Sequence, residues 1–170
     1  MRLRLKSIHI YMRTLYNLIP LVLLLVSYGL EGQEPSFELR DLENQWTTYQ
    51  EVKGENLTVI DFWATWCQPC LRSIPEINNL YINFQDRGVN FIGISIDGPR
   101  NQSKLKPYVK SLGITYKILR DVNSEVMADM NITVVPTLLI LNKDGDILFL
   151  HEGYRPGDEQ LIKKQIEKYL

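Results

Sequence analysis

Both cysteines of the chain lie in one short run, where a strand-like segment gives way to a helix-like one. Residues 57–63 are β-branched or aromatic and carry one charge, which is typical of a strand buried on both faces. From Leu71 onward, apolar residues recur at steps of three and four, the spacing of an amphipathic helix. Between these segments stands the motif Cys67-Gln68-Pro69-Cys70. We therefore expect the cysteines at the N-terminus of a helix that follows a central strand.

A helix N-terminus is a distinctive place for a sulfur atom. There Cys67 faces backbone N–H groups without helical partners and the positive end of the helix dipole. Both favour the thiolate, so Cys67 is expected to be nucleophilic near neutral pH. Cys70 follows one turn later, close enough to attack a mixed disulfide formed at Cys67. Pro69 is tolerated in this turn because its missing N–H has no helical partner there.

A C-x-x-C pair has two other common uses in proteins. A structural zinc site needs two further ligands, but the remaining metal-binding candidates are His9 and His151, and the chain has no third cysteine. We therefore expect neither a metal nor another cofactor. The second alternative, a pair of inert core cysteines, is disfavoured by the preceding tryptophan and the following helix. Redox use of the pair is favoured.

Residues 62–70, Phe-Trp-Ala-Thr-Trp-Cys-Gln-Pro-Cys, resemble the active-site signature of the thioredoxin superfamily. Their Trp-Ala-Thr-Trp-Cys form is typical of its extracytoplasmic, TlpA/ResA-like branch, and the branch's elements recur in order from about residue 36 to residue 170. The resemblance implies a thioredoxin-like α/β fold. Such a fold has a central mixed β-sheet flanked by helices, here with an N-terminal β-hairpin and a central helix/strand insertion.

The pattern along the chain agrees with this fold. Alternating residues predict a hairpin from 36–40 and 45–49, followed by a turn at 51–56. Helix 69–86 and strand 89–96 imply a parallel crossover back to the central strand. The remaining expected elements are a helix at 102–112, an extended piece at 114–119, a helix at 123–130, an antiparallel hairpin from 138–141 and 147–151, and a helix at 158–170.

Residues 1–32 are interpreted as a signal peptide or an N-terminal membrane anchor, and residues 33–170 as the thioredoxin-like domain. Basic residues precede an apolar core at 18–26. Ser27 and Gly29 suit cleavage after Gly29, whereas an uncleaved anchor would keep the basic residues cytoplasmic. Either way the domain is expected outside the cytoplasm, in the periplasm or on the outer face of the membrane, and to contact the membrane only through this segment.

Charge is unevenly distributed along the chain. Four of its 19 basic residues lie before the first acidic residue, Glu31, which leaves 15 basic against 20 acidic residues from there on. A mildly acidic domain without a basic stripe disfavours nucleic-acid binding. With 45% hydrophobic residues, the composition suits a single globular domain, which we expect to be a monomer.

Asp61 is a carboxylate inside the expected central strand. Burial is costly for such a group unless it is paired or protonated. Strand alternation puts Asp61 on the Cys67 side of the sheet, behind the cysteines. The resemblance implies that it relays the proton of the resolving cysteine, and the alternative is a strand-end Asp exposed to water. The exported branch commonly has Asn here and Glu three residues after the second cysteine, where this chain has Ser73.

Three further residues are candidates by resemblance. The resemblance implies that Pro136 follows a cis peptide bond and packs against the active-site disulfide. The alternative is an ordinary trans proline at the start of a strand. The Val135 backbone would then pair with an extended substrate segment. Trp66 is expected as an exposed apolar platform beside the cysteines, and Trp63 as a core residue.

The expected function is that of an extracytoplasmic thiol–disulfide oxidoreductase, with Cys67 as attacking thiolate and Cys70 as resolving thiol. The branch is mostly reducing, so a disulfide-containing protein client is expected. By resemblance alone, the haem-binding cysteine pair of an apocytochrome c is a candidate client, which would place the protein in cytochrome c maturation. A reductant there implies a transmembrane thiol electron donor. The alternatives are a broad-specificity dithiol oxidase or isomerase, and a redox-silent binding module. A peroxidase is disfavoured because the peroxiredoxin Thr-x-x-Cys pattern is absent around Cys67.

Overall fold

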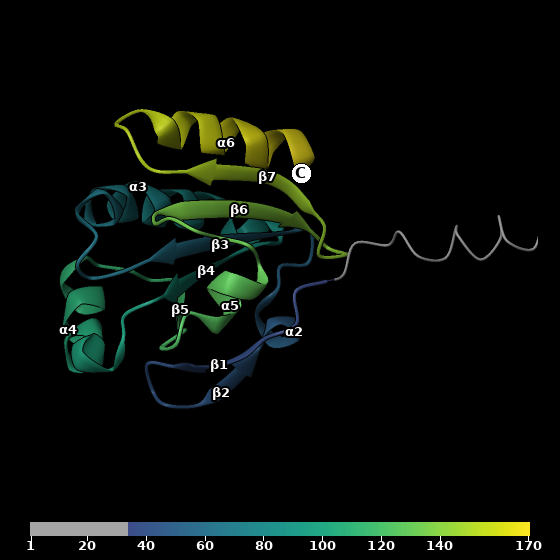
Figure 1. Ribbon diagram of the computed structural model, residues 1–170. Helices are drawn as coiled ribbons and strands as arrows, with labels where there is room; N and C mark the ends of the chain where they lie inside the picture. Colours follow the sequence, from purple (N-terminus) through teal and green to yellow (C-terminus); the bar gives the residue numbers. More distant parts are fainter. Residues whose placement is uncertain (1–33) are drawn as a thin grey trace, which may run out of the picture. The chain divides into compact units, whose positions relative to one another are not determined.

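One mixed sheet organises the chain in the computed structural model, which describes residues 34–170 (Figure 1). The segment assigned to targeting, 1–32, lies outside the described residues. Seven strands follow the order β2-β1-β5-β4-β3-β6-β7, so the expected α/β class with a mixed sheet is confirmed. Their bounds are β1 Glu38–Asp41, β2 Trp46–Thr48, β3 Leu57–Trp63, β4 Val89–Ser95, β5 Lys117–Arg120, β6 Thr137–Asn142 and β7 Ile147–Glu152.

Strand β3 is an internal strand of the sheet, next to the middle strand β4. It pairs in parallel with β4, where Asp61 is opposite Gly93, and antiparallel with β6, where Asp61 is opposite Leu138. All seven of its residues are buried. This explains the nearly continuous apolar run in the sequence, since neither face of a covered strand meets water.

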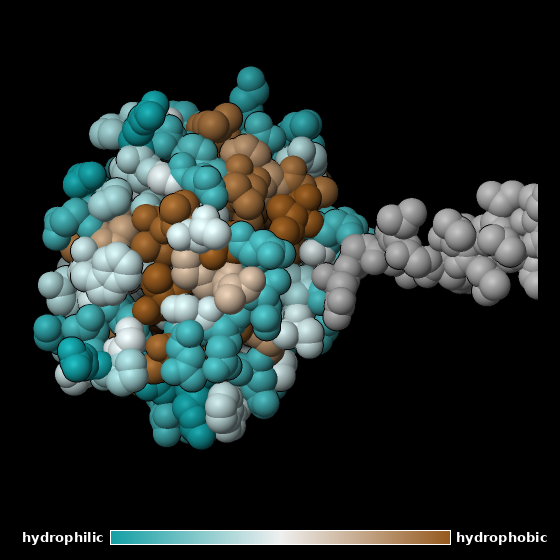
Figure 2. Space-filling view, in the orientation of Figure 1, coloured by the Kyte–Doolittle hydropathy of each residue, from teal (hydrophilic) through white to brown (hydrophobic). Residues whose placement is uncertain are grey.

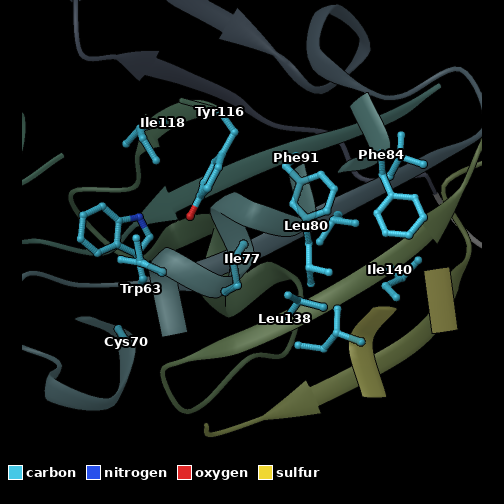
Figure 3. Close-up of a cluster of buried hydrophobic side chains, with 14 of the residues drawn as sticks. Trp63, Cys70, Ile77, Leu80, Phe84, Phe91, Tyr116, Ile118, Leu138 and Ile140 are labelled. Atoms are coloured by element: carbon cyan, nitrogen blue, oxygen red, sulfur yellow. The ribbon is translucent and has the colours of Figure 1, made fainter. Parts of the chain in front are cut away.

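Helices cover both faces of the sheet. They are α2 Tyr49–Val52, α3 Gln68–Phe84, α4 Gln102–Ser111, α5 Glu125–Asp129 and α6 Asp158–Tyr169, with short 3₁₀ turns at η1 Gln85–Arg87 and η2 Pro99–Asn101. Helices α3, α4 and α6 pack on one face, in a core cluster that includes Trp63 and Cys70 (Figure 3). Helices α2 and α5 pack on the other. Within residues 34–170, no helix is long and apolar enough to cross a membrane.

The expected elements are present with small changes in their bounds. The N-terminal hairpin is confirmed, because β1 and β2 pair antiparallel. The expected turn at 51–56 is wrong in its first part, because α2 begins at Tyr49. The Thr48 backbone N–H donates to the Glu51 carboxylate at 2.7 Å, and Tyr49 buries its ring at 1% exposure. Burial of the Tyr49 ring in the core thus replaces the last expected strand residue with the first residue of a helix.

Strand β7 forms one edge of the sheet. Ile147 and Leu150 on this strand are 50% and 45% exposed. Apolar side chains gather on the surface over this part of the molecule (Figure 2). Ile147 lies beside Leu141, toward the end of the sheet where β3 begins, whereas the cysteines follow the end of β3. The apolar surface around Ile147 is therefore at the opposite end of the sheet from the cysteines.

Gly54, shortly before β3 begins, is closely surrounded by backbone atoms. A Cβ added there would press on the Leu57 carbonyl and lie 2.7 Å from the Asn90 backbone nitrogen. Because backbone atoms cannot rotate away, we expect Gly54→Ala to lower the free energy of unfolding by roughly 1–3 kcal/mol in urea titrations. Gly98→Ala is the control, since a Cβ there meets nothing within 4 Å. Equal stability of the two variants would contradict this packing.

Candidate active site

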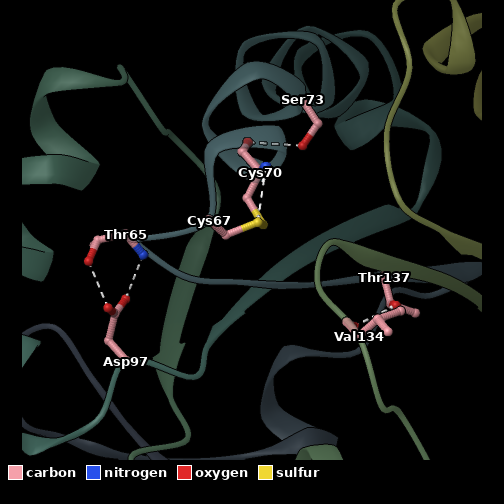
Figure 4. The surroundings of a disulfide bond; sticks show 7 residues. All are labelled: Thr65, Cys67, Cys70, Ser73, Asp97, Val134 and Thr137. Carbon is pink, nitrogen blue, oxygen red and sulfur yellow. Dashed lines mark hydrogen bonds between the residues drawn. A yellow bond between two sulfur atoms is a disulfide. The ribbon is translucent and has the colours of Figure 1, made fainter.

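The two cysteines form a disulfide at the start of α3 (Figure 4). Their Cα atoms are 5.3 Å apart, and Cys67 occupies the N-cap position of the helix. The backbone N–H of Cys70 donates to the Cys67 sulfur at 3.3 Å. The sulfur therefore takes the place of the oxygen that usually caps a helix, and receives one of its free N–H groups. The expected position at the strand–helix junction is confirmed.

The two sulfur-bearing residues differ in access to solvent. Cys67 retains 5% exposure, whereas Cys70 is fully buried. The neighbouring Trp66 is 56% exposed, and Trp63 is fully buried. Trp66 therefore lies at the surface beside the disulfide and Trp63 lies in the core, as expected. Of the two cysteines, only Cys67 is open to an incoming molecule.

The loop that leads to Cys67 is held by Asp97. Its carboxylate accepts the Thr65 backbone N–H at 2.9 Å and the Thr65 hydroxyl at 2.7 Å (Figure 4). It also accepts the Ser95 hydroxyl at 2.8 Å, and Asp97 itself is fully buried. The sequence pattern between the strand at 89–96 and the helix at 102–112 does not by itself assign Asp97 a role. Asp97 was missed because its partners come from a different part of the chain, although an Asp directly after a buried strand is a signal that could have found it.

The Val135–Pro136 peptide bond is cis, as the resemblance implied. Val135 packs at the edge of the core cluster that contains both cysteines. The Thr137 hydroxyl donates to the Val134 carbonyl at 2.8 Å and closes the turn into β6 (Figure 4). The Pro136 carbonyl accepts the Gly153 N–H at 2.7 Å. The turn is thus fixed from both β6 and the segment after β7.

Asp61 is 1% exposed, so the alternative of a water-exposed strand-end residue is wrong. Neither carboxylate oxygen has a hydrogen-bond partner among the described residues. Burial raises the pKa of Asp61 to about 7, because a charge is poorly solvated in the core. Its protonation therefore changes within the physiological pH range. A carboxyl that titrates there is suited to accepting and returning a proton.

Ser73 does not replace the acid found at this position in the exported branch. Its hydroxyl donates to the Cys70 carbonyl at 3.0 Å, within the same helix, and the residue is 2% exposed. Asp61 is therefore the buried acid of the strand that leads to the cysteines, and α3 contributes none at position 73. Within residues 34–170, no group of three or more His, Cys, Asp or Glu side chains is arranged to hold a metal ion.

The raised pKa of Asp61 has a consequence for stability. Unfolding returns the group to its ordinary pKa of about 4, so between pH ~4 and ~7 the folded state holds the extra proton. Stability supplied by this group is therefore present below pH ~4 and lost as the pH rises toward ~7. We expect Asp61→Asn to exceed the wild type in free energy of unfolding at pH 8 by on the order of 4 kcal/mol, and to differ little near pH 4.

Urea unfolding at a series of pH values measures this difference. The control is Asp129→Asn, which alters an exposed carboxylate of α5. A constant difference between Asp61→Asn and wild type across the pH range would show that Asp61 titrates normally.

Comparisons with known proteins agree with the geometry. Residues 31–149 match the model of the AhpC/TSA family. The thiol–disulfide oxidoreductase ResA of Bacillus thuringiensis subsp. konkukian is 29% identical over 140 residues, which cover 82% of this chain and 76% of the relative.

Solved structures give the same result. An uncharacterized thioredoxin-like protein from Porphyromonas gingivalis is 34% identical, with a TM-score of 0.65 over 81% of this chain and 92% of the other. StoA from Bacillus subtilis has a TM-score of 0.64 at 24% identity, over 78% and 97% of the two chains. With its Cys67–Cys70 disulfide, the chain thus belongs to the AhpC/TSA family and is a thioredoxin-like thiol–disulfide oxidoreductase.

Proposed function

We propose that this protein reduces disulfide bonds of protein clients outside the cytoplasmic membrane, using Cys67 and Cys70. The observation that carries the proposal is the asymmetry of the pair. One sulfur caps a helix and belongs to a residue that retains 5% exposure, while the other belongs to a fully buried residue one turn away. This suits an attacking and a resolving thiol.

The reaction begins with both cysteines reduced. The Cys67 thiolate attacks one sulfur of the client disulfide, and the other client sulfur leaves as a thiolate that takes up a proton. Cys70 then loses its proton to the Asp61 carboxylate and attacks the Cys67 sulfur. The second client thiol is released as the Cys67–Cys70 disulfide forms. Two electrons pass to the client, and Asp61 afterwards returns its proton to solvent or to the leaving thiolate.

The surface beside Cys67 suits an extended client segment. Trp66 offers an apolar face at 56% exposure, and Val134, just before the cis bond, is 44% exposed. We propose that the Val135 backbone pairs with the client in the manner of a β-strand, while Pro136 contacts the disulfide region. A protein with a flexible cysteine pair, such as an apocytochrome c, has the required chemistry.

The location and electron supply follow from the N-terminal sequence. Basic residues before an apolar core favour export of the domain, as a cleaved or an anchored protein. A reductant there requires electrons from the cytoplasmic side, so a transmembrane dithiol protein is the proposed donor to the oxidised pair.

Serine variants test the roles of the two sulfurs. We expect Cys67→Ser to abolish reduction of insulin disulfides, because the remaining cysteine, Cys70, is fully buried and cannot form the mixed disulfide with a client. Cys70→Ser should retain the first attack and accumulate a covalent adduct with the client, visible on a non-reducing gel and lost with dithiothreitol. Ser73→Ala is the matched control in the same helix. Insulin reduction by Cys67→Ser would refute the assignment.

The reduction potential of the pair tests the direction of electron flow. Because Gln68 and Pro69 add no charge that would stabilise the dithiol form, we expect a potential near about −270 mV, as in thioredoxin, rather than about −120 mV, as in strong oxidants. Equilibration with glutathione, followed by mass spectrometry of alkylated protein, measures it. A value near the oxidising limit would replace the reductase proposal with the dithiol oxidase or isomerase.

A further inference from the structure

Buried polar atoms without hydrogen-bond partners gather near Asp61. Six such side-chain atoms occur in residues 34–170, and four of them are the two Asp61 oxygens, the Trp63 indole nitrogen and the Tyr116 hydroxyl. A buried polar group without a partner costs about 1–3 kcal/mol. Four of them on neighbouring residues therefore indicate a function rather than a packing fault.

Gly93 lies next to the residues that carry these unpaired atoms. It is paired in register with Asp61 on β3 and with Ile118 on β5, so the three residues share a sheet face. A Cβ at Gly93 would lie 3.0 Å from the Tyr116 ring and 3.2 Å from the Trp63 indole nitrogen. Since Trp63 follows Asp61 by two residues, it lies on the same face. The absent side chain at Gly93 thus leaves room for the Ile118 side chain, the Tyr116 ring and the Trp63 indole nitrogen next to the strand partner of Asp61.

Helix α3 holds Tyr116 in this place. The Asn78 side chain accepts both the backbone N–H of Thr115 at 2.8 Å and its hydroxyl at 3.0 Å. The Tyr116 ring packs edge-on against Tyr81, with centroids 5.9 Å apart. Its hydroxyl points toward the indole of Trp63 (Figure 3). Tyr116 is therefore anchored to the same helix that carries Cys70.

The surroundings of Asp61 otherwise contain no charged group among the described residues. Strand β4 contributes Gly93, β6 contributes Leu138, and α3 contributes Cys70 to the core cluster on this face. Tyr116 is the remaining titratable neighbour, and burial and then the charge of Asp61 raise its pKa, so it stays protonated as a donor. Two uncharged donors, one O–H and one N–H, thus belong to residues that lie beside Gly93, the strand partner of Asp61, and neither donor makes a hydrogen bond in this structure.

We propose that Tyr116 is a positioning residue of this enzyme: its hydroxyl, together with the Trp63 indole N–H, stabilises the ionised carboxylate of Asp61 that accepts the Cys70 proton. The proposal rests on the proton-acceptor role given to Asp61 in the proposed function. In each cycle the Cys70 S–H bond breaks and an Asp61 O–H bond forms, and the O–H of Tyr116 stays intact. The donors matter when Asp61 carries its charge.

The decisive variant is Tyr116→Phe, which removes a hydroxyl without a hydrogen-bond partner and should leave the urea midpoint nearly unchanged at a pH well below 7, where Asp61 is protonated. Carboxyl ¹³C NMR of aspartate-labelled protein, in the disulfide and dithiol forms, gives the Asp61 titration midpoint. We expect it to rise by about one pH unit in Tyr116→Phe, since a donor to the charged form is lost. Tyr81→Phe, in the same aromatic cluster, should leave it in place. Equal midpoints in wild type and Tyr116→Phe overturn the proposal.

Single-turnover release of the client from the mixed disulfide supplies the kinetic readout. At pH values below the midpoint of its rate–pH profile, the rate of client release should fall about tenfold in Tyr116→Phe. A tenfold change in rate corresponds to a shift of one pH unit in the Asp61 titration. In an Asp61→Asn background, Tyr116→Phe should have no further effect; a further tenfold loss there would overturn the proposal, because the hydroxyl would then act independently of Asp61. A shifted NMR midpoint with an unshifted kinetic profile sustains the Tyr116 assignment and refutes the proton-acceptor role of Asp61.

Discussion

The carboxyl end of β3 is the constraint on which the site depends. This strand is hydrogen-bonded to β4 and β6 and covered on both faces, so its backbone cannot shift without breaking two ladders. At the end of the strand, the Trp63 carbonyl accepts the Ile96 N–H at 3.0 Å. Thr65, two residues after Trp63, donates its backbone N–H to the Asp97 carboxylate. The backbone between the end of β3 and the start of α3 is therefore held in one conformation by these hydrogen bonds. That conformation places Cys67 at the helix N-terminus, where the unpaired N–H groups favour its thiolate.

The same rigidity makes a buried acid possible in β3. A carboxyl in the core without a hydrogen-bond partner opposes folding above its pKa, and only a well-packed surrounding tolerates it. Here Trp63 and both cysteines belong to the cluster on its face of the sheet, while Leu138 and Gly93 flank it on the neighbouring strands. Under the proposed function, stability is thus exchanged for a proton acceptor behind the disulfide, which is a common relation between active sites and the folds that support them.

Much of the fold follows from local pattern. The apolar run of β3, the amphipathic α3 and the Asp-Gly turn before β7 each appear in the sequence with the right period, because their burial repeats along the segment. The short helix α2 does not, since it exists to bury Tyr49 and spans only one turn. Likewise α5 has five residues, fewer than the pattern at 123–130 indicated, because Asp121 accepts the backbone N–H groups of Glu125 and Met127.

The sequence by itself determined the cysteine pair, its place between strand and helix, and the acid in the central strand, because these depend on neighbouring residues. By resemblance it also indicated Pro136. Only the tertiary structure decided which groups meet at the pair. Asp97 reaches Thr65 across 32 positions, and Asn78 of α3 holds the segment of Tyr116 across 37. Contacts of this kind arise when strands pair and helices pack, and no periodicity within one segment encodes them.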